Sequence, residues 1–160
     1  MAAKKKIYYL AYGSNLNVDQ MSRRCPDARP VGVTILKDWQ LAFKGSKTGS
    51  YLTIDPVPGA STPVAVWEVS ASDIDALDRY EGYPTFYTKK EIEVTYRGIR
   101  TNRARTVTAF VYTMTEGRPV GIPSNGYVRT CAIGYDNFGF NKRFLWNALD
   151  RGYREVMQGA

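Results

Sequence analysis

Short segments in which apolar and polar residues alternate constrain the fold of this chain more than any other feature of its sequence. The alternation is clear at residues 31–35, 39–43, 92–96 and 107–111. Because successive side chains of a β-strand point to opposite faces, each segment is expected to form a strand with one buried face. Segments with the helical period of 3.6 lie between some of these strands. The chain is therefore predicted to have a mixed α+β fold that is rich in strands.

Turn signals between these segments predict how the strands connect. Residues 31–43 are expected to form a hairpin around a turn at Lys37-Asp38, and residues 51–55 are expected to pair with 64–69 across a proline-bearing loop. The arginine-rich segment 97–105 is predicted to be a long, exposed hairpin loop. Evenly spaced short strands with few helices indicate a small barrel or a strongly curled sheet, with helices at one side.

Helix signals lie before, between and after the strands. Asn17 and Gln20 have the spacing of a capping box, which predicts a short helix there. Ser72 is predicted to cap the next helix, with Asp75 in the box position and Gly82 at the end. Two further helices are predicted, at 125–136 and around the apolar positions of 140–149.

The chain of 160 residues has no internal repeat or break in composition. It is therefore predicted to be a single domain, 1–160. No apolar stretch approaches the roughly 20 residues of a membrane helix, so no membrane partner is expected. The positively charged start is followed by an apolar run that ends at Tyr12-Gly13, which disfavours a signal peptide and favours a cytoplasmic location.

The formal net charge of +7 raises the question of nucleic-acid binding. The basic residues fall at predicted termini and turns along the whole chain, without exposed aromatic residues between them. This scatter favours a solvated surface over a nucleic-acid interface, which stays a third interpretation. The sequence carries no signal for an oligomeric state.

The chain contains no histidine and two cysteines, Cys25 and Cys131. The cysteines are far apart in sequence and form no C-x-x-C pair, so no zinc site is predicted. Two reduced thiols are favoured, with a disulfide left open. Any chemistry must therefore use carboxylates, tyrosines, serines, lysines or these thiols, and no metal or other cofactor is predicted.

The apolar strand predicted at residues 7–11 stops at Tyr12-Gly13-Ser14-Asn15 and is followed by a short helix. Such a turn exposes several backbone N–H groups together, which suits a small anion. The Ser14 and Asn15 side chains can donate hydrogen bonds in the same direction, and a carboxylate has about four acceptor sites to receive them. The further glycines and the lysine of a phosphate-binding loop are missing, which disfavours a nucleotide.

Glu81 lies in the last turn of the helix that is predicted to end at Gly82. A carboxylate there faces the negative end of the helix dipole, which is unfavourable for a purely structural residue. The neighbouring aromatic residues are Tyr80, Tyr83, Phe86 and Tyr87. Partial desolvation by such neighbours disfavours the charged form and makes the carboxylate a better proton acceptor. Glu81 is therefore a candidate general base, with an exposed, solvated glutamate as the alternative.

Two motifs in this order resemble the gamma-glutamylcyclotransferase-like superfamily, which includes plant AIG2-like proteins and an enzyme of butirosin biosynthesis. The motifs are Tyr12-Gly13-Ser14-Asn15 and Leu77-Asp78-Arg79-Tyr80-Glu81-Gly82, with Tyr87 after them; the likeness continues through Pro123-Ser124, Tyr127 and Gly134. It covers nearly the whole chain. The resemblance implies a small barrel with flanking helices.

The resemblance also implies roles for the site residues. Gly13, Ser14 and Asn15 would bind the glutamyl group, Glu81 would be the catalytic acid and base, and Tyr12, Tyr87 and Tyr127 would line the pocket. Whether Phe86 or Tyr87 faces the pocket is open at this point.

The implied reaction releases 5-oxoproline and a free amine or amino acid from a small gamma-glutamyl compound, without a cofactor. The branch that degrades glutathione typically carries leucine at the fourth position of the loop, where this chain has Asn15, so glutathione is disfavoured as the substrate. A non-catalytic module that binds an acidic small molecule on the same fold is the alternative.

Overall fold

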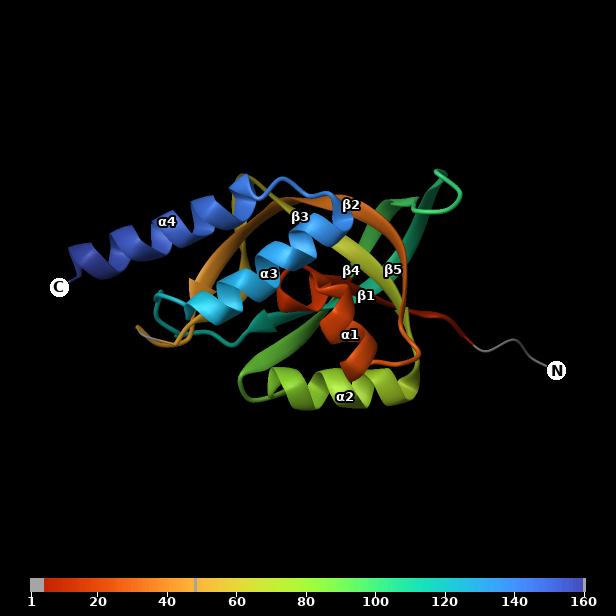
Figure 1. Cartoon of the computed structure of the whole chain (residues 1–160), viewed down its shortest axis with the longest axis horizontal. Helices are drawn as coiled ribbons and strands as arrows, with labels where there is room; N and C mark the ends of the chain where they lie inside the picture. Colours follow the sequence, from red (N-terminus) through yellow and green to blue (C-terminus); the bar gives the residue numbers. More distant parts are fainter. Residues whose placement is uncertain (1–4, 48, 160) are drawn as a thin grey trace.

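In the part of the chain that the structure describes, a closed barrel of strands in the order β1-β3-β2-β4-β5 forms the centre (Figure 1). The computed structural model describes residues 5–47 and 49–159 of the chain. The strands are β1 (Ile7–Ala11), β2 (Arg29–Lys44), β3 (Tyr51–Val69), β4 (Tyr87–Gly98) and β5 (Ala104–Met114). β1 is antiparallel to β3 and parallel to β5, so it closes the barrel between them. The predicted α+β barrel is confirmed.

The barrel has two ends, and each collects a different set of connections. At the base end β1, β2 and β5 begin and β3 and β4 finish; at the mouth end β1 finishes and the Tyr12–Asn15 loop follows. The strands contribute buried side chains to one hydrophobic core, among them Leu10, Leu41, Ile54, Val66 and Val111. The strands therefore form a filled core and present their loops at the two ends.

The predicted hairpins within residues 31–43 and 51–69 are wrong. β2 and β3 are each continuous and pair with each other along nearly their whole length. At the predicted turn the register shifts between Lys37 and Trp39, where Asp38 has φ of 68° and its carboxylate accepts the Gly59 N–H at 2.9 Å. A β-bulge interrupts the alternation by one residue, as a turn does, so the local pattern did not distinguish the two.

The long loop predicted over residues 97–105 is also shorter than expected. β4 continues to Gly98 and β5 begins at Ala104, so only a tight turn separates the two strands. The turn is closed by the Gly98 N–H, which donates to the Arg103 carbonyl at 2.9 Å. Arg97 and Arg105 therefore lie on strand ends at the base of the barrel, and Arg100 and Arg103 lie in the turn between them.

Within the described residues, four α-helices and one short 3-10 helix lie around the barrel: η1 (Ser14–Leu16), α1 (Val18–Arg24), α2 (Ala71–Glu81), α3 (Asn125–Phe138) and α4 (Arg143–Gln158). Figure 1 shows α1 and α2 on one side of the barrel and α3 and α4 on the other, with α4 extending to the C-terminal end. None of these helices is both long and apolar enough to cross a membrane. The predicted Asn17 cap of α1 is confirmed, since its side chain accepts the Gln20 N–H at 3.0 Å.

The predicted cap of α2 at Ser72 is wrong, because Ser70 is the N-cap residue. Ser70 and Asp73 form a complete capping box. The sequence holds two overlapping pairs with this spacing, and a long-range contact favours the first, since Asp73 also accepts the Asp27 backbone N–H at 3.3 Å. α2 starts at the base end of the barrel and runs to the mouth end, which carries its last residue, Glu81, toward the Tyr12–Asn15 loop (Figure 1).

Candidate active site

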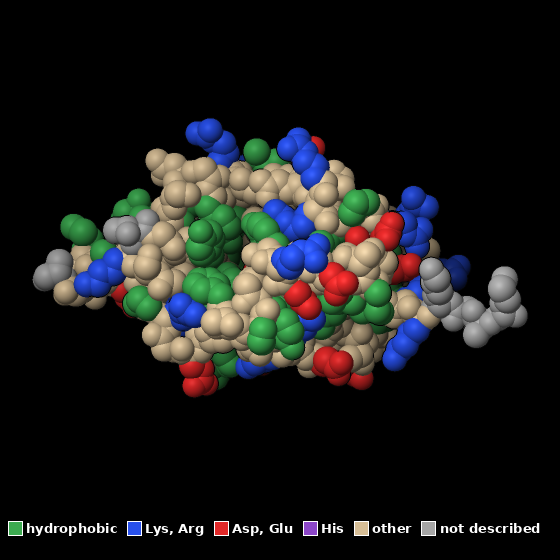
Figure 2. Space-filling model, turned by 90° about the horizontal axis from the view of Figure 1, so that it is seen from below, with side chains coloured by type: hydrophobic (Ala, Val, Ile, Leu, Met, Phe, Trp, Pro, Cys, Tyr) green, Lys and Arg blue, Asp and Glu red, His purple; other side chains and the backbone are tan. Residues whose placement is uncertain are grey.

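A cavity of about 330 Å³ lies at the mouth end of the barrel, between the loop after β1 and the C-terminal end of α2. Every site residue predicted from the sequence lines it: Tyr12, Gly13, Ser14, Asn15, Glu81, Tyr87 and Tyr127. Figure 2 views the molecule from the side of α2 and shows a hollow whose walls are largely hydrophobic side chains. The structure thus brings together a donor loop and a single acid that are far apart in sequence.

Asn15 connects the loop directly to the acid. Its side-chain Nδ2 donates to the Glu81 carboxylate Oε1 at 3.3 Å and to the Tyr9 hydroxyl at 2.9 Å. Its Oδ1 accepts a hydrogen bond from the Arg24 guanidinium. Because all of these contacts are buried or partly buried, the amide has a fixed orientation, with its two donor hydrogens toward the cavity side of the site.

Glu81 is the last residue of α2, and Gly82 ends the helix in the left-handed conformation with φ of 65°. The carboxylate is half-buried, and desolvation raises the pKa of Glu81 to about 7, while the nearby Arg24 charge lowers it. Both protonation states are therefore populated near neutral pH, which suits a group that must accept a proton and return it.

Ser14 and Tyr80 form the outer edge of the same site. Their hydroxyl oxygens lie 2.8 Å apart, and the Arg24 guanidinium lies over the Tyr80 ring, 3.4 Å from its centroid. Tyr80 is 43% exposed, so this edge borders solvent. Arg24 thus contacts the loop through Asn15 and the end of α2 through Tyr80, and it holds these two walls together.

The tyrosines of the inner wall use their hydroxyl groups to hold the backbone. Tyr12 donates to the Tyr112 carbonyl at 2.8 Å and Tyr87 donates to the Leu52 carbonyl at 2.7 Å. The Tyr127 hydroxyl accepts the Leu52 N–H at 3.1 Å. Burial raises the pKa of Tyr12, Tyr87 and Tyr127 well above the usual value of a phenol, so these walls are uncharged.

Several lining residues escaped the sequence interpretation: Tyr9, Tyr51, Leu52, Arg79, Tyr80, Gly82 and Tyr112. Phe86 and Tyr87 both line the cavity, so the choice between them was unnecessary. Tyr9 carried only a weak signal, its place three residues before Tyr12, because Tyr8 beside it is also a tyrosine. Tyr112 carried none, because no local pattern connects β5 with the end of α2.

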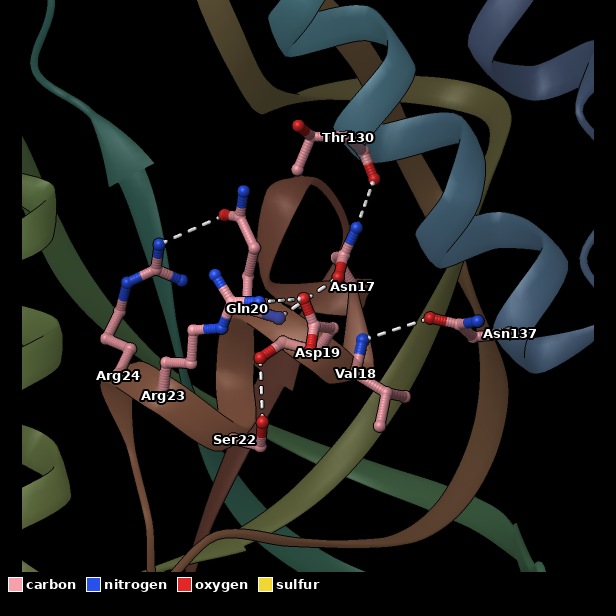
Figure 3. Close-up of polar contacts among 9 residues, drawn as sticks. All are labelled: Asn17, Val18, Asp19, Gln20, Ser22, Arg23, Arg24, Thr130 and Asn137. Carbon is pink, nitrogen blue, oxygen red and sulfur yellow. Dashed lines mark hydrogen bonds and ion pairs between the residues drawn. The ribbon is translucent and has the colours of Figure 1, made fainter.

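α3 supports the loop from the side away from the cavity. Asn17, just after the loop, donates to the Thr130 carbonyl at 3.2 Å, and Asn137 accepts the Val18 N–H at 3.0 Å (Figure 3). The helix approaches closely because it has glycine at position 134, where an added Cβ would lie 2.7 Å from backbone atoms of Leu16 and Asn17. The loop is therefore held by a rigid helix.

Asp78, one turn before Glu81, holds the C-terminal end of α2 against the barrel. Its Oδ1 accepts the Tyr112 hydroxyl at 2.6 Å and pairs with the Lys89 ammonium at 2.8 Å. The helix that carries the acid is thus anchored to both β4 and β5. A substrate that fits here would meet preorganised donors on one side and a positioned carboxyl group on the other.

The chemistry of this cavity suits a small molecule with a carboxylate and an amine. The loop supplies hydrogen-bond donors for an anion, Glu81 supplies an acceptor for an N–H group, and Arg79 supplies a cation at the exposed edge. The volume of about 330 Å³ is at the lower end of the range for ligand pockets, roughly 300 to 1,000 Å³. The site therefore fits a compact, amino-acid-like ligand.

Comparisons with known proteins identify a family for this chain. The family model described as gamma-glutamyl cyclotransferase, AIG2-like, matches residues 9–129. Gamma-glutamylcyclotransferase of Bos taurus is 32% identical over 134 residues, 79% of this chain and 68% of that protein. The protein of the same name from Homo sapiens is 31% identical over 141 residues, 82% of this chain and 71% of that protein. A solved structure of a gamma-glutamyl cyclotransferase superposes with a TM-score of 0.70 at 27% identity, covering 90% of this chain and 86% of the other.

Proposed function

The chain belongs to the gamma-glutamyl cyclotransferase, AIG2-like family, and we propose that it is an enzyme that releases 5-oxoproline and a free amine from a small gamma-glutamyl compound. One contact carries this proposal. The Glu81 carboxylate lies 3.3 Å from the Asn15 amide, and both residues line the mouth cavity, so one small molecule in this cavity could contact the acid and the donor loop together.

The substrate supplies its own nucleophile in this reaction. The α-amine of the glutamyl group attacks the γ-carbonyl carbon, a C–N bond forms that closes a five-membered ring, and the C–N bond to the departing amine breaks. No water is consumed, and no redox change occurs. A base and an acid are the groups that the protein must provide.

We assign both of these tasks to Glu81. The α-amine is mostly protonated at neutral pH, so the Glu81 carboxylate first accepts a proton from it, and the protonated Glu81 then donates to the departing nitrogen. After the attack the ring nitrogen carries two hydrogens; one of them passes through the same carboxylate to the departing amine and the other remains as the N–H of 5-oxoproline, so the charge of the α-ammonium ends on the released amine. A pKa of about 7 suits both steps, because neither form of Glu81 dominates strongly at neutral pH.

We assign the substrate's α-carboxylate to the Gly13, Ser14 and Asn15 loop. Fixing that carboxylate folds the glutamyl chain so that its amine approaches its own γ-carbonyl carbon, and intramolecular positioning of this kind can lower a barrier by up to about 7 to 11 kcal/mol. Tyr12, Tyr87 and Tyr127 would form uncharged walls that limit access of water. Loop N–H groups that do not contact the carboxylate are available to stabilise the oxyanion of the tetrahedral intermediate.

The first prediction is that Glu81→Gln abolishes turnover while ligand binding persists. Glutamine keeps the size of the side chain and an acceptor for Asn15 but accepts no proton, so release of 5-oxoproline from gamma-glutamyl amino acids should fall by at least about a hundredfold. The measurement is the rate of 5-oxoproline formation, together with calorimetric binding of the same substrate. Glu155→Gln, on the exposed side of α4, is the control and should keep the wild-type rate.

Two results would contradict this assignment. A Glu81→Gln variant with the wild-type rate would remove Glu81 from the mechanism. A wild-type protein that binds gamma-glutamyl compounds and releases no 5-oxoproline from any of them would favour the alternative, a binding module for an acidic small molecule.

A further inference from the structure

A second cavity, of about 500 Å³, lies at the base end of the barrel. It is lined by the start of β2, the end of β4 and the β4–β5 turn. It shares no lining residue with the mouth cavity. In Figure 1 the β4–β5 turn projects at the upper right, away from the C-terminal end of α2. This cavity is therefore separate from the candidate active site, and an occupant would not compete with its substrate.

Four arginines line this second cavity: Arg29, Arg100, Arg103 and Arg105. Arg29 pairs with Glu68 at 3.2 Å, and Glu68 also pairs with Lys6 at 3.8 Å. Arg100, Arg103 and Arg105 form no ion pair within residues 5–47 and 49–159. The side of the cavity formed by the β4–β5 turn thus carries uncompensated positive charge.

The strand register places part of this charge beside the buried Tyr96. Arg105 lies opposite Tyr96 in the β4–β5 pair, so their side chains share one face of the sheet. Arg103 is two positions from Arg105 along the extended chain, which places it toward the same face. Tyr96 is only 5% exposed, and its ring fits over Gly32, where an added Cβ would lie 2.1 Å from the ring carbon Cδ2.

The remaining wall is apolar. Pro30, Val31 and Ile99 line the cavity beside Tyr96, and Ile99 is 50% exposed. Thr101 adds a hydroxyl group next to the arginines. The cavity therefore combines guanidinium groups on one side with a flat, apolar surface on the other.

We propose that the base cavity binds a phosphorylated small molecule that also carries a planar ring. Guanidinium groups match phosphate oxygens in a bidentate manner, and several of them around one cavity suit a group with two or more negative charges better than a single carboxylate. The ring would lie against the apolar wall formed by Pro30, Val31 and Ile99. A nucleic-acid strand fits less well, because the arginines gather around one cavity and, among the described residues, no exposed aromatic side chain lines it.

The test measures binding of inorganic pyrophosphate and of ATP to the full chain by titration calorimetry, with acetate as the carboxylate comparison. Both phosphate compounds should bind at millimolar concentration or below, ATP more tightly because its ring adds contact area, and acetate should not bind. The double variant R103Q/R105Q should weaken binding of both by at least about tenfold, since each lost charge-assisted hydrogen bond is large on this scale. R129Q/R143Q removes the same charge from exposed positions on α3 and α4, and it should change the affinity by less than about twofold.

The thermal unfolding curve of R103Q/R105Q checks that the barrel is intact. Arg100→Gln, in the exposed turn, is the second variant if the pair disturbs folding, and it should weaken binding in the same direction. Absence of binding by both phosphate compounds would overturn the proposal, as would equal weakening by the two double variants. Equal affinities for pyrophosphate and ATP would overturn the ring contact, and tighter binding of a single-stranded oligonucleotide than of ATP would replace the small molecule with nucleic acid.

Discussion

At the scale of single residues, Glu81 occupies a position that costs stability. Its carboxylate is half-buried, lies at the negative end of α2 and has a pKa raised to about 7 by desolvation. A group that served only to stabilise the helix would not be placed there. A loss of stability at this position is expected if the carboxyl group serves to exchange protons, as proposed for Glu81.

The second prediction concerns stability and pH at this residue. A carboxyl group whose pKa is higher in the folded than in the unfolded chain favours folding below the unfolded value, 4.5, and this contribution is lost as the pH rises to about 7. The wild type should therefore lose unfolding free energy between pH 5 and pH 8 that Glu81→Gln does not lose. The difference in unfolding free energy between the two should shift in favour of the variant by about 2 to 3 kcal/mol at most. Chemical denaturation at both pH values measures this difference. The same experiment on Glu155→Gln should give a flat difference, and a flat difference for Glu81→Gln would refute the raised pKa.

The third prediction concerns Arg24 as a positioning residue. It donates to Asn15, covers the Tyr80 ring and lowers the pKa of Glu81. Arg24→Gln should move the acidic limb of the kcat/KM profile to higher pH, because the charge that lowers the pKa of Glu81 is removed. It should also reduce kcat/KM at neutral pH by about ten- to hundredfold, because a charge-assisted hydrogen bond to the loop is lost. The pH profile of 5-oxoproline release measures both effects.

The neighbouring Arg23 offers a matched control, because its ion pair with Asp19 is exposed and remote from the cavity. Arg23→Gln should leave the profile unchanged. Arg24→Lys should keep the pH limb near its original position, since the charge remains, while kcat/KM stays reduced. A profile that does not move in Arg24→Gln would assign the residue a packing role alone.

At the scale of elements, the contact between α3 and η1 holds the donor loop in place. This contact depends on glycine at position 134, because any larger residue would meet the backbone of Leu16 and Asn17. α3 is distant from the loop in sequence, and its own hydrogen bonds to Asn17 and Val18 lock the register between the two (Figure 3). The position of the donor loop thus depends on α3, although Tyr127 is the one α3 residue that lines the mouth cavity.

The fourth prediction follows from this close approach. Gly134→Ala should destabilise the fold by about 1 to 3 kcal/mol and raise KM, because α3 or η1 must shift to admit the methyl group. Gly126→Ala in the same helix is the control, since an added Cβ there meets nothing within 4 Å, and it should be neutral or slightly stabilising. Urea denaturation and KM for 5-oxoproline release measure the two effects. Equal behaviour of the two variants would show that the α3 contact does not position the loop.

Much of the fold and of the site could be predicted at this scale. Alternation identified the strands, capping signals identified α1, α2 and α3, and the apolar positions of 140–149 identified α4, which begins at Arg143 and continues to Gln158. The strand boundaries could not be predicted, because the bulge at Lys37 and Trp39 and the tight turn after Gly98 depend on pairing partners that are distant in sequence. The same limit applies to the N-cap of α2. Ser70 and Ser72 both have the right spacing, and the contact of Asp73 with the distant Asp27 favours Ser70.

At the scale of the whole molecule, barrel closure explains why Tyr9 and Tyr112 were missed as site residues. They come from adjacent strands of the closed sheet, and their rings lie 5.8 Å apart between centroids. No motif in either strand marks this meeting. Barrel closure also brings together basic residues that are scattered in the sequence. Lys6, Arg29 and Arg105 lie at the base end because β1, β2 and β5 all start at that end of the barrel.

The position of β1 between β3 and β5 has a consequence for the order of events during synthesis. The strand that leads into the Tyr12–Asn15 loop registers with Ala65–Val69 on one side and with Ala109 and Phe110 on the other. A nascent chain therefore carries its loop motif out of the ribosome long before either neighbour of β1 exists. Since such distant pairings close late, the pocket should become competent among the last parts of the protein, after translation has passed β5.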